Sequence, residues 1–204
     1  MIDAGKVSVI VNCRNGDKYL LRALESILSQ TYENLEVIFW DNQSTDNSAE
    51  IFKSIIDVRF RYFYAPNLTN LYSARNSAVE KSLGELVAFL DVDDWWEPTK
   101  LAKQVSRFDS ADVGLVYSNY YRYDESSKIT KTVFKTPLPS GILTDQLIRN
   151  YTIGLLTIVV RRSAFEYVAG FTREYNIIGD FDFVLRVSAS YKIGVVSEPL
   201  AFYR

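Results

Sequence analysis

The sequence contains no histidine and a single cysteine, and both shortages narrow its chemistry. Without histidine, these 204 residues can form neither a histidine-based catalytic triad nor a histidine-ligated zinc site. Acid–base chemistry then falls to carboxylates. One cysteine, Cys13, excludes an intrachain disulfide framework, is typical of a reducing compartment and is most simply a small buried apolar residue.

Long apolar runs and a strong net charge are missing as well. The longest apolar tract, Ile153–Val160, includes glycine and threonine and is well short of a membrane span. The first residues lack the apolar core of a signal peptide. A net charge of −2 gives no overall attraction to nucleic acid. We therefore expect a soluble, cytoplasmic globular chain that binds no nucleic acid.

The stretch Leu86–Asp94 is the most informative part of the chain, because an apolar run of strand length ends in three carboxylates. Packing acids there is unfavourable unless water or a cation solvates them. Alternate strand residues share a face, so we expect Asp91 and Asp93 to lie about 6.6 Å apart on one side, with Asp94 turned away. Two such carboxylates can bind one hard cation that carries a phosphorylated ligand. The alternative is an exposed acidic turn that caps the helix near Pro98.

The first half of the chain alternates strand and helix signals. Expected strands cover residues 6–13, 35–40, 58–64 and 86–90. Expected helices cover 17–30, 71–82 with a C-cap at Gly84, 98–108, and a segment N-capped by Ser44, Thr45 or Asp46. This alternation predicts an α/β fold with a mostly parallel, doubly wound sheet, whose ligands bind beyond the carboxyl ends of the strands. Three polar segments fall at those ends and predict a single site: 12–15, 41–46 and 91–94.

The second half is less regular. Expected strands cover residues 113–123, 129–134 and 153–161, and expected helices cover 163–169 and 181–190. A proline-rich loop spans 137–141. No segment is convincing as a linker, so the pattern predicts one domain over residues 1–204.

Six motifs in order carry a family resemblance: VSVIVNCRN, WDNQSTD, SARN, LDVDDWW, GDFDFVLR and PLAFYR. An isolated D-x-D is weak evidence, but the six together, from Val7 to Arg204, resemble family 2 of the GT-A-fold glycosyltransferases. The resemblance implies a GT-A (Rossmann-like) mostly parallel sheet flanked by helices. It also implies that residues 1–110, approximately, bind a nucleotide sugar, and that the less regular residues from about 111 to 204 bind the acceptor.

The resemblance further implies a metal-dependent, inverting transfer of a sugar from a nucleotide-diphosphate donor. The expected donor is a UDP-sugar, the cofactor is a divalent cation (Mn or Mg), and the acceptor is a hydroxyl of a glycan or lipid-linked saccharide. Family association points to bacterial surface polysaccharide synthesis. A lipid-linked acceptor would bring the enzyme to the inner face of a membrane as a peripheral protein.

On the donor side, the resemblance places Asn12 and Arg14 beside the nucleoside and Asp41 against the base, typically uracil. Arg75 would lie near the base or the diphosphate. Each role has a structural alternative, because Asp41 can cap a turn and Arg75 can pair with a nearby acid.

Toward the metal and the acceptor, the resemblance places Asp91 near the ribose and metal and assigns the cation to Asp93. It identifies Asp180 as the general base, although the same residue could be a helix N-cap. We interpret Asp182 and Arg186 as a structural ion pair, because they lie four residues apart on the expected helix.

The tryptophans and tyrosines have open roles. Trp95 and Trp96 either pack or stack on a sugar. The cluster Tyr117–Tyr123 is more simply a strand surface or an interface than an acceptor platform.

The chain departs from the family at two positions. Gln43 stands where the family commonly has glycine, so we expect this loop to follow another path. Gly179 stands where glutamate often precedes the catalytic aspartate.

Other classes fit the sequence less well. A sugar nucleotidyltransferase would favour a glycine-rich basic loop after the first strand, and a dinucleotide oxidoreductase would need G-x-G-x-x-G there. A non-catalytic nucleotide-binding or interaction module of the same fold is a further alternative.

Overall fold

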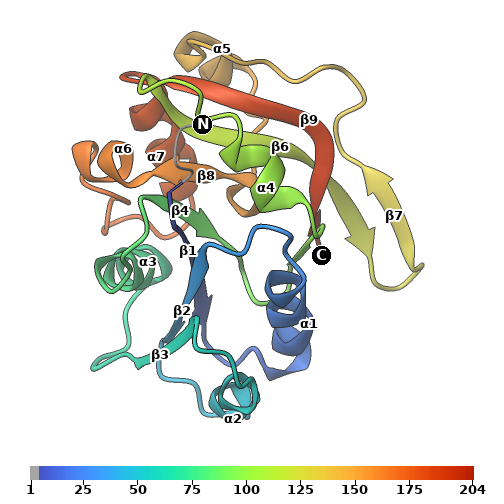
Figure 1. The fold of residues 1–204 in the computed structure, drawn as a ribbon, viewed down its shortest axis with the longest axis vertical. Coiled ribbons are helices and arrows are strands. Elements are labelled where there is room, and N and C mark those ends of the chain that lie inside the picture. The colour runs from blue at the N-terminus through green and yellow to red at the C-terminus, as the bar shows by residue number, and fades with distance from the viewer. Residues whose placement is uncertain (1–4) are drawn as a thin grey trace.

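A twisted nine-stranded sheet organises residues 5–204, the part of the chain that the computed structural model describes (Figure 1). The strands are β1 Val7–Cys13, β2 Leu35–Asp41, β3 Phe60–Tyr64, β4 Leu86–Phe89, β5 Trp95–Trp96, β6 Val113–Asp124, β7 Ile129–Thr132, β8 Val159–Arg161 and β9 Lys192–Tyr203. The helices are α1 Asp17–Leu28, α2 Ser48–Ser54, α3 Leu71–Glu80, α4 Lys100–Val105, α5 Thr144–Arg149, α6 Arg162–Tyr167 and α7 Gly179–Ser188, with a 3₁₀ turn, η1, at Leu155–Thr157.

Strands β1 to β4 form the parallel half of the sheet, in the order β3-β2-β1-β4. Strands β1 and β2 are buried along their whole length because helices cover both faces. In Figure 1, α1 and α2 lie on one side of these strands and α3 on the other. Their carboxyl ends therefore lie at one edge, as the sequence pattern predicts, and the expected α/β architecture is confirmed.

The second half extends the sheet with mixed directions. Strand β8 runs antiparallel to both β4 and β6, whereas β6 and β9 run parallel to each other. A hairpin of β6 and β7 projects from the body of the molecule (Figure 1). The sequence patterns predict β6, β7 and the position of β8 but miss α5, β5 and β9.

Several predicted boundaries are wrong for local reasons. The stretch 153–161 is not one strand, because the Thr157 hydroxyl and N–H both bond to the Gly154 carbonyl and close the 3₁₀ turn before β8. Helix α2 begins at Ser48 after Asn47, so the expected cap at 44–46 lies too early. Helix α3 ends at Glu80 with Lys81 as its cap, three residues before the expected cap at Gly84.

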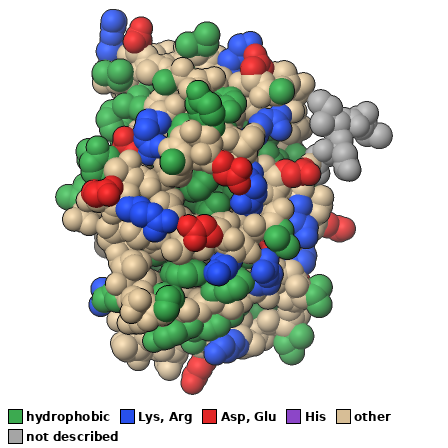
Figure 2. Space-filling view, turned by 90° about the vertical axis from the view of Figure 1, so that its left-hand side faces the viewer, with side chains coloured by type: hydrophobic (Ala, Val, Ile, Leu, Met, Phe, Trp, Pro, Cys, Tyr) green, Lys and Arg blue, Asp and Glu red, His purple; other side chains and the backbone are tan. Residues whose placement is uncertain are grey.

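The surface carries charges of both signs. On the face that includes α3 and α6, Figure 2 shows basic and acidic side chains interspersed, with apolar side chains gathered below them. None of the helices within residues 5–204 is long and apolar enough to cross a membrane.

Candidate active site

The loops that follow β1 and β2 are locked together by hydrogen bonds. Asn15 accepts from the Thr45 N–H at 2.8 Å, and its own N–H donates to the Ser44 hydroxyl at 3.1 Å. The Gly16 N–H donates to the Ser48 hydroxyl at 2.9 Å. These bonds hold two of the three predicted polar segments as one rigid unit.

Gln43 keeps the left-handed backbone that its loop requires, with φ at 64°. Its side chain donates to the carbonyls of Ala65 and Pro66, which anchors the strained residue. The expectation that this loop follows another path than in the family stays a prediction.

Asp41 lies at the end of β2 and is 1% exposed. One carboxylate oxygen accepts from the Ser44 N–H at 2.7 Å, and the other accepts from the Tyr62 hydroxyl at 2.6 Å. Burial, reinforced by this carboxylate, raises the pKa of Tyr62. The alternative role of Asp41, as a turn cap, is therefore supported by these hydrogen bonds. The contact of Asp41 with a base stays a prediction.

Asn12 and Arg14 flank the end of β1. The Asn12 side-chain amide is buried without a hydrogen-bond partner among residues 5–204, and so is the indole N–H of Trp40, its neighbour on β2. Two orphaned donors side by side are unusual in a folded protein, because each forfeits a hydrogen bond with water. Arg14 is exposed.

Arg75 and Asp91 form a bidentate-like ion pair. Arg75, from α3, is 3% exposed, and its Nη2 lies 2.7 Å and 2.9 Å from the two Asp91 oxygens. The alternative role of Arg75, pairing with a nearby acid, is therefore observed. The acid is Asp91, the residue predicted to lie near the ribose.

The segment Asp91–Asp94 is a turn rather than a strand end. Strand β4 stops at Phe89, and the Asp94 N–H donates to the Asp91 carbonyl at 3.1 Å. Strand alternation consequently does not apply, and the expectation that Asp94 turns away is wrong. Asp94 is 3% exposed and lines a cavity with Asp91, whereas Asp93 lies exposed in the turn.

Asp93 and Asp94 in this turn are poorly neutralised. Asp94 accepts a hydrogen bond from the Arg204 N–H at 3.1 Å, yet burial and the neighbouring Asp91 raise its pKa to about 8. Partial desolvation, together with the Asp91 charge, also raises the pKa of Asp93. Such shifts are typical of carboxylates at functional sites.

A cavity of about 280 Å³ lies between the two halves of the sheet and brings Arg75, Asp91 and Asp180 together. Its wall also includes Tyr72 from α3, Tyr120 from β6 and residues 154–156 at η1. Asn12, Arg14, Asp41 and Asp93 are not among its lining residues. The geometry therefore joins three of the seven predicted residues in one cavity.

Asp180 lies in the first turn of α7, not at its cap. The helix begins at Gly179 after Ile178, without a side-chain capping bond. The N-cap alternative is therefore wrong. Asp182 pairs with Arg186 at 2.6 Å and accepts from the Thr172 hydroxyl, so its structural interpretation is confirmed.

The carboxylates of the turn offer hard oxygen ligands of the kind that Mg²⁺ and Mn²⁺ prefer. No group of three or more acids, cysteines or histidines within residues 5–204 is arranged to hold a metal by itself. A cation bound through one or two carboxylates and a diphosphate needs no such group. Asp91 has a close cationic side-chain partner, and Asp93 and Asp94 have none as close. Asp93 and Asp94 therefore fit this kind of site.

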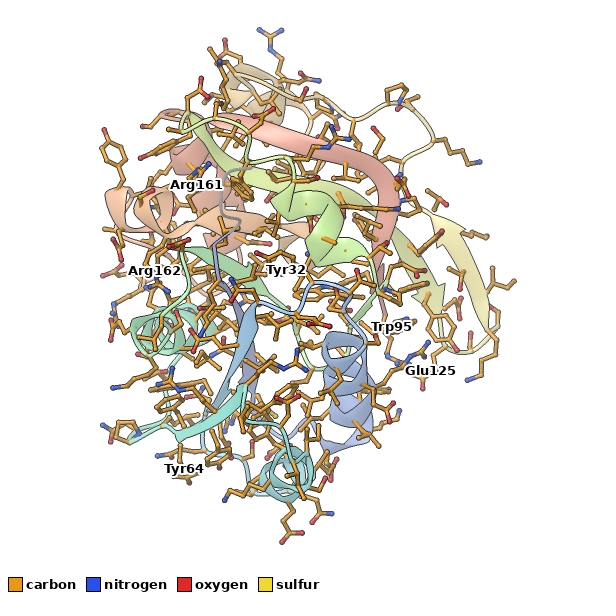
Figure 3. The ribbon with its side chains drawn as sticks, in the orientation of Figure 1. Tyr32, Tyr64, Trp95, Glu125, Arg161 and Arg162 are labelled. Carbon is orange, nitrogen blue, oxygen red and sulfur yellow. The ribbon has the colours of Figure 1, made fainter. Side chains whose placement is uncertain are left out.

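Trp95 and Trp96 are packing residues. Trp95 is stacked on Phe202 at 4.9 Å, with the Arg22 guanidinium 3.4 Å from its ring centroid. The Trp96 indole donates to the Leu156 carbonyl at 2.9 Å. Figure 3 shows Trp95 and Glu125 near the C-terminal end of the chain.

Sequence reasoning misses two residues of the site, Tyr72 and Arg204. Arg204 donates through Nε to the Asp93 carbonyl, holds Asp94 and pairs with Glu125. Its position in the PLAFYR motif is the signal that could have found it. Tyr72 lies on α3 beside Arg75 and carries no motif signal of its own.

The family is established by comparison. The chain matches the Glycosyl transferase family 2 description over residues 8–168 and belongs to that family. It is 36% identical over 131 residues to the Escherichia coli UDP-Glc:α-D-GlcNAc-diphosphoundecaprenol β-1,3-glucosyltransferase WfaP, covering 64% of this chain and 51% of the relative. WfgD of the same organism, with the same described activity, is 33% identical over 162 residues, covering 77% and 60%. The chain thus spans about half to three fifths of these relatives.

Solved structures confirm the GT-A fold. Staphylococcus aureus TarS 1–349 in complex with UDP superimposes with a TM-score of 0.83 at 22% identity, over 97% of this chain and 60% of that one. A Pyrobaculum calidifontis mannosyltransferase, in complex with GDP-Man and Mn²⁺, gives 0.75 at 18% identity, over 98% and 56%.

Proposed function

We propose that this chain transfers a sugar, glucose in the first instance, from a UDP-sugar to a hydroxyl of a lipid-diphosphate-linked saccharide. The observation that carries the proposal is the cavity in which Asp91 and Asp180 meet at the carboxyl edge of the sheet. WfaP and WfgD, whose described donor is UDP-Glc and whose described acceptor is GlcNAc-diphosphoundecaprenol, supply the substrate class.

The donor would bind to the half of the chain before about residue 110. The orphaned amide of Asn12 offers a hydrogen bond to the nucleoside, with Arg14 beside it. Asp41 would accept from the base, and the Arg75–Asp91 pair would border the ribose and diphosphate. A divalent cation bound at Asp93 would neutralise charge on the departing diphosphate.

The acceptor would bind against the half after about residue 111. Asp180 would remove the proton from the attacking hydroxyl as its oxygen bonds to the anomeric carbon. The bond from that carbon to the diphosphate breaks at the same time, and UDP leaves. A single base on the face opposite the leaving group gives inversion of the anomeric configuration.

An acceptor of this class resides in a membrane. The chain would meet it at the membrane surface as a peripheral protein, on the cytoplasmic side where nucleotide sugars are found, and would serve bacterial surface polysaccharide synthesis.

The test is Asp180→Asn, assayed with UDP-glucose and GlcNAc-diphosphoundecaprenol. Asparagine cannot accept the proton, so transfer should fall by on the order of 10²-fold or more, with UDP binding unchanged. Asp145→Asn is the matched control, because Asp145 also lies in the first turn of a helix but is exposed. Near-wild-type transfer by Asp180→Asn would make Asp182 the next candidate. UDP binding without any turnover by the wild type would favour the non-catalytic module.

A further inference from the structure

Tyr72 connects α3 to the start of α7. It is 3% exposed, and its ring is stacked on Phe171 with the centroids 5.6 Å apart. Its hydroxyl lies 2.8 Å from the Ile177 carbonyl oxygen and 3.5 Å from Oδ1 of Asp180. A rotation of the O–H bond alone can therefore move the proton from the carbonyl to the carboxylate.

Gly179 leaves the space that the Tyr72 ring fills. A Cβ at position 179 would lie 2.6 Å from both Cε2 and Cζ of that ring, far inside van der Waals contact. Glycine is otherwise a poor residue for a helix, since it costs about 1 kcal/mol relative to alanine. The close approach of the ring explains why the helix begins with glycine, and it places the phenol directly beside the next residue, Asp180.

We propose that Tyr72 is a positioning residue for Asp180, whose hydroxyl fixes the orientation of the carboxylate by sharing its proton between Ile177 and Oδ1. This inference rests on the proposed function, in which Asp180 is the base. When an acceptor hydroxyl donates to one oxygen of the carboxylate, the phenol holds the other. The base then enters the reaction already oriented, which removes part of the entropic cost of the transition state.

The groups around Asp180 leave this role to Tyr72. Within residues 5–204, Tyr72 is the only side chain hydrogen-bonded to the Asp180 carboxylate. The Tyr151 hydroxyl is buried nearby without a partner, and burial together with the Asp180 charge raises its pKa. Asp182, on the same helix, is committed to Arg186. The other charged groups that line the cavity are Arg75, Asp91 and Asp94.

Tyr72→Phe tests the proposal because it keeps the ring against Phe171 and Gly179 and removes only the hydroxyl. Losing this hydrogen bond removes a donor from the carboxylate, so the ¹³C resonance of the Asp180 carboxyl at pH 7 should shift. The resonance is recorded by NMR on ¹³C-labelled aspartate carboxyls, with Asp180→Asn to assign it. Tyr175→Phe is the control, since it removes an exposed hydroxyl from the loop that precedes α7.

The activity readout is a split between kcat and KM. Tyr72→Phe should lower kcat for transfer about tenfold, a modest part of what an oriented base contributes, while KM for UDP-glucose stays unchanged. An unchanged Asp180 carboxyl resonance in Tyr72→Phe overturns the proposal and leaves Tyr72 a clamp on Ile177. Absence of transfer in the wild type would instead overturn the proposed function, and the resonance would still decide whether Tyr72 acts on Asp180.

Discussion

The two ends of the parallel sheet hold buried carboxylates in opposite states. At the amino end, Glu36 on β2 is 4% exposed and accepts from the Ser8 hydroxyl at 2.8 Å, the Leu83 N–H at 2.5 Å and Arg61 at 2.9 Å. Burial by itself would raise the pKa of Glu36, but the hydrogen bonds from Leu83, Ser8 and Arg61 outweigh it and leave the pKa lowered. This carboxylate joins three strands and the loop before β4.

At the carboxyl end, the buried Asp94 receives one backbone hydrogen bond, and its pKa is raised to about 8. The same fold thus gives one buried acid several hydrogen-bond donors and gives another only one. A buried acid with so few donors keeps its proton near neutral pH, and a ligand such as a cation can compensate for the cost of ionising it. Glu36 belongs to the scaffold, and the Asp91–Asp94 turn belongs to the site.

The largest effect should come from Asp93→Ala at the carboxyl end. We expect this change to abolish the metal-dependent part of UDP binding and to leave the free energy of unfolding unchanged, because the exposed side chain contributes little to the core. Calorimetry with UDP, with and without Mn²⁺, measures the first quantity and urea unfolding the second. Metal-dependent affinity equal to that of the wild type would remove Asp93 from the site.

Glu36→Gln should show the reverse pattern. Breaking this buried network should lower the free energy of unfolding by about 3 kcal/mol at pH 7, with UDP binding unchanged. Since the folded-state pKa is lowered, the carboxylate stabilises the fold above about pH 4.3, and this contribution is lost as the pH falls through the folded-state pKa. The mutant should therefore be less sensitive to acid between pH 7 and 3.5 in urea unfolding. The exposed Glu33→Gln is the control, and similar losses in both variants would contradict the special role of Glu36.

The contrast between the ends also explains what the sequence could predict. Apolar strand runs such as Leu35–Trp40 and the acids that follow them are local signals, so the parallel half and the edge that carries the site are predictable. Glu36 offers no such signal, since its partners come from positions 8, 61 and 83 and meet only in the folded sheet.

The misses in the second half have the same origin. Strand β9 has an irregular register with β6, including shifts near Asn119, so its pattern does not alternate cleanly. The turn at Asp91–Asp94 is closed by one backbone hydrogen bond, and no residue type announces it. Tyr72 becomes visible as part of the site only when α7 is placed against α3.

Asp41 combines features of both ends of the sheet. It lies at the carboxyl end, where we expect the ligand, yet its carboxylate accepts hydrogen bonds from Ser44 and Tyr62. We expect Asp41→Ala to weaken UDP binding by about 1.5–3 kcal/mol, the loss of a charge-assisted hydrogen bond to the base. Tyr62→Phe is the control, since it removes one internal donor without touching the ligand side. Equal UDP affinity in wild type and Asp41→Ala, by calorimetry, would place Asp41 with Glu36 in the scaffold.

A substitution at Lys100 should have the smallest effect of these predictions. Lys100 is also the clearest exception to the contrast between the two ends of the sheet. It is 0% exposed, its ammonium has no hydrogen-bond partner among residues 5–204, and it lies 4.1 Å from the Trp96 ring centroid. It does not line the cavity, so no ligand there compensates for it. Burial lowers the pKa of Lys100 well below its usual value, which means that the unfolded state binds more protons. Stability should then rise with pH from neutral toward the unfolded-state pKa of about 10.4.

Lys100→Met should raise the free energy of unfolding by about 1–2 kcal/mol at pH 7, because an apolar side chain of similar length avoids the cost of burying an amine. It should also flatten the rise in stability between pH 7 and 9.5, measured by urea unfolding. Lys103→Met is the matched control, since Lys103 lies on the same helix but pairs with Glu198 at the surface. A variant that is less stable than the wild type at pH 7 would show that the contact with Trp96 outweighs the desolvation of the amine. In that case a buried titratable group without a hydrogen-bond partner would not by itself indicate a ligand site in this fold, and the assignment of the Asp91–Asp94 turn would rest on the binding data for Asp93.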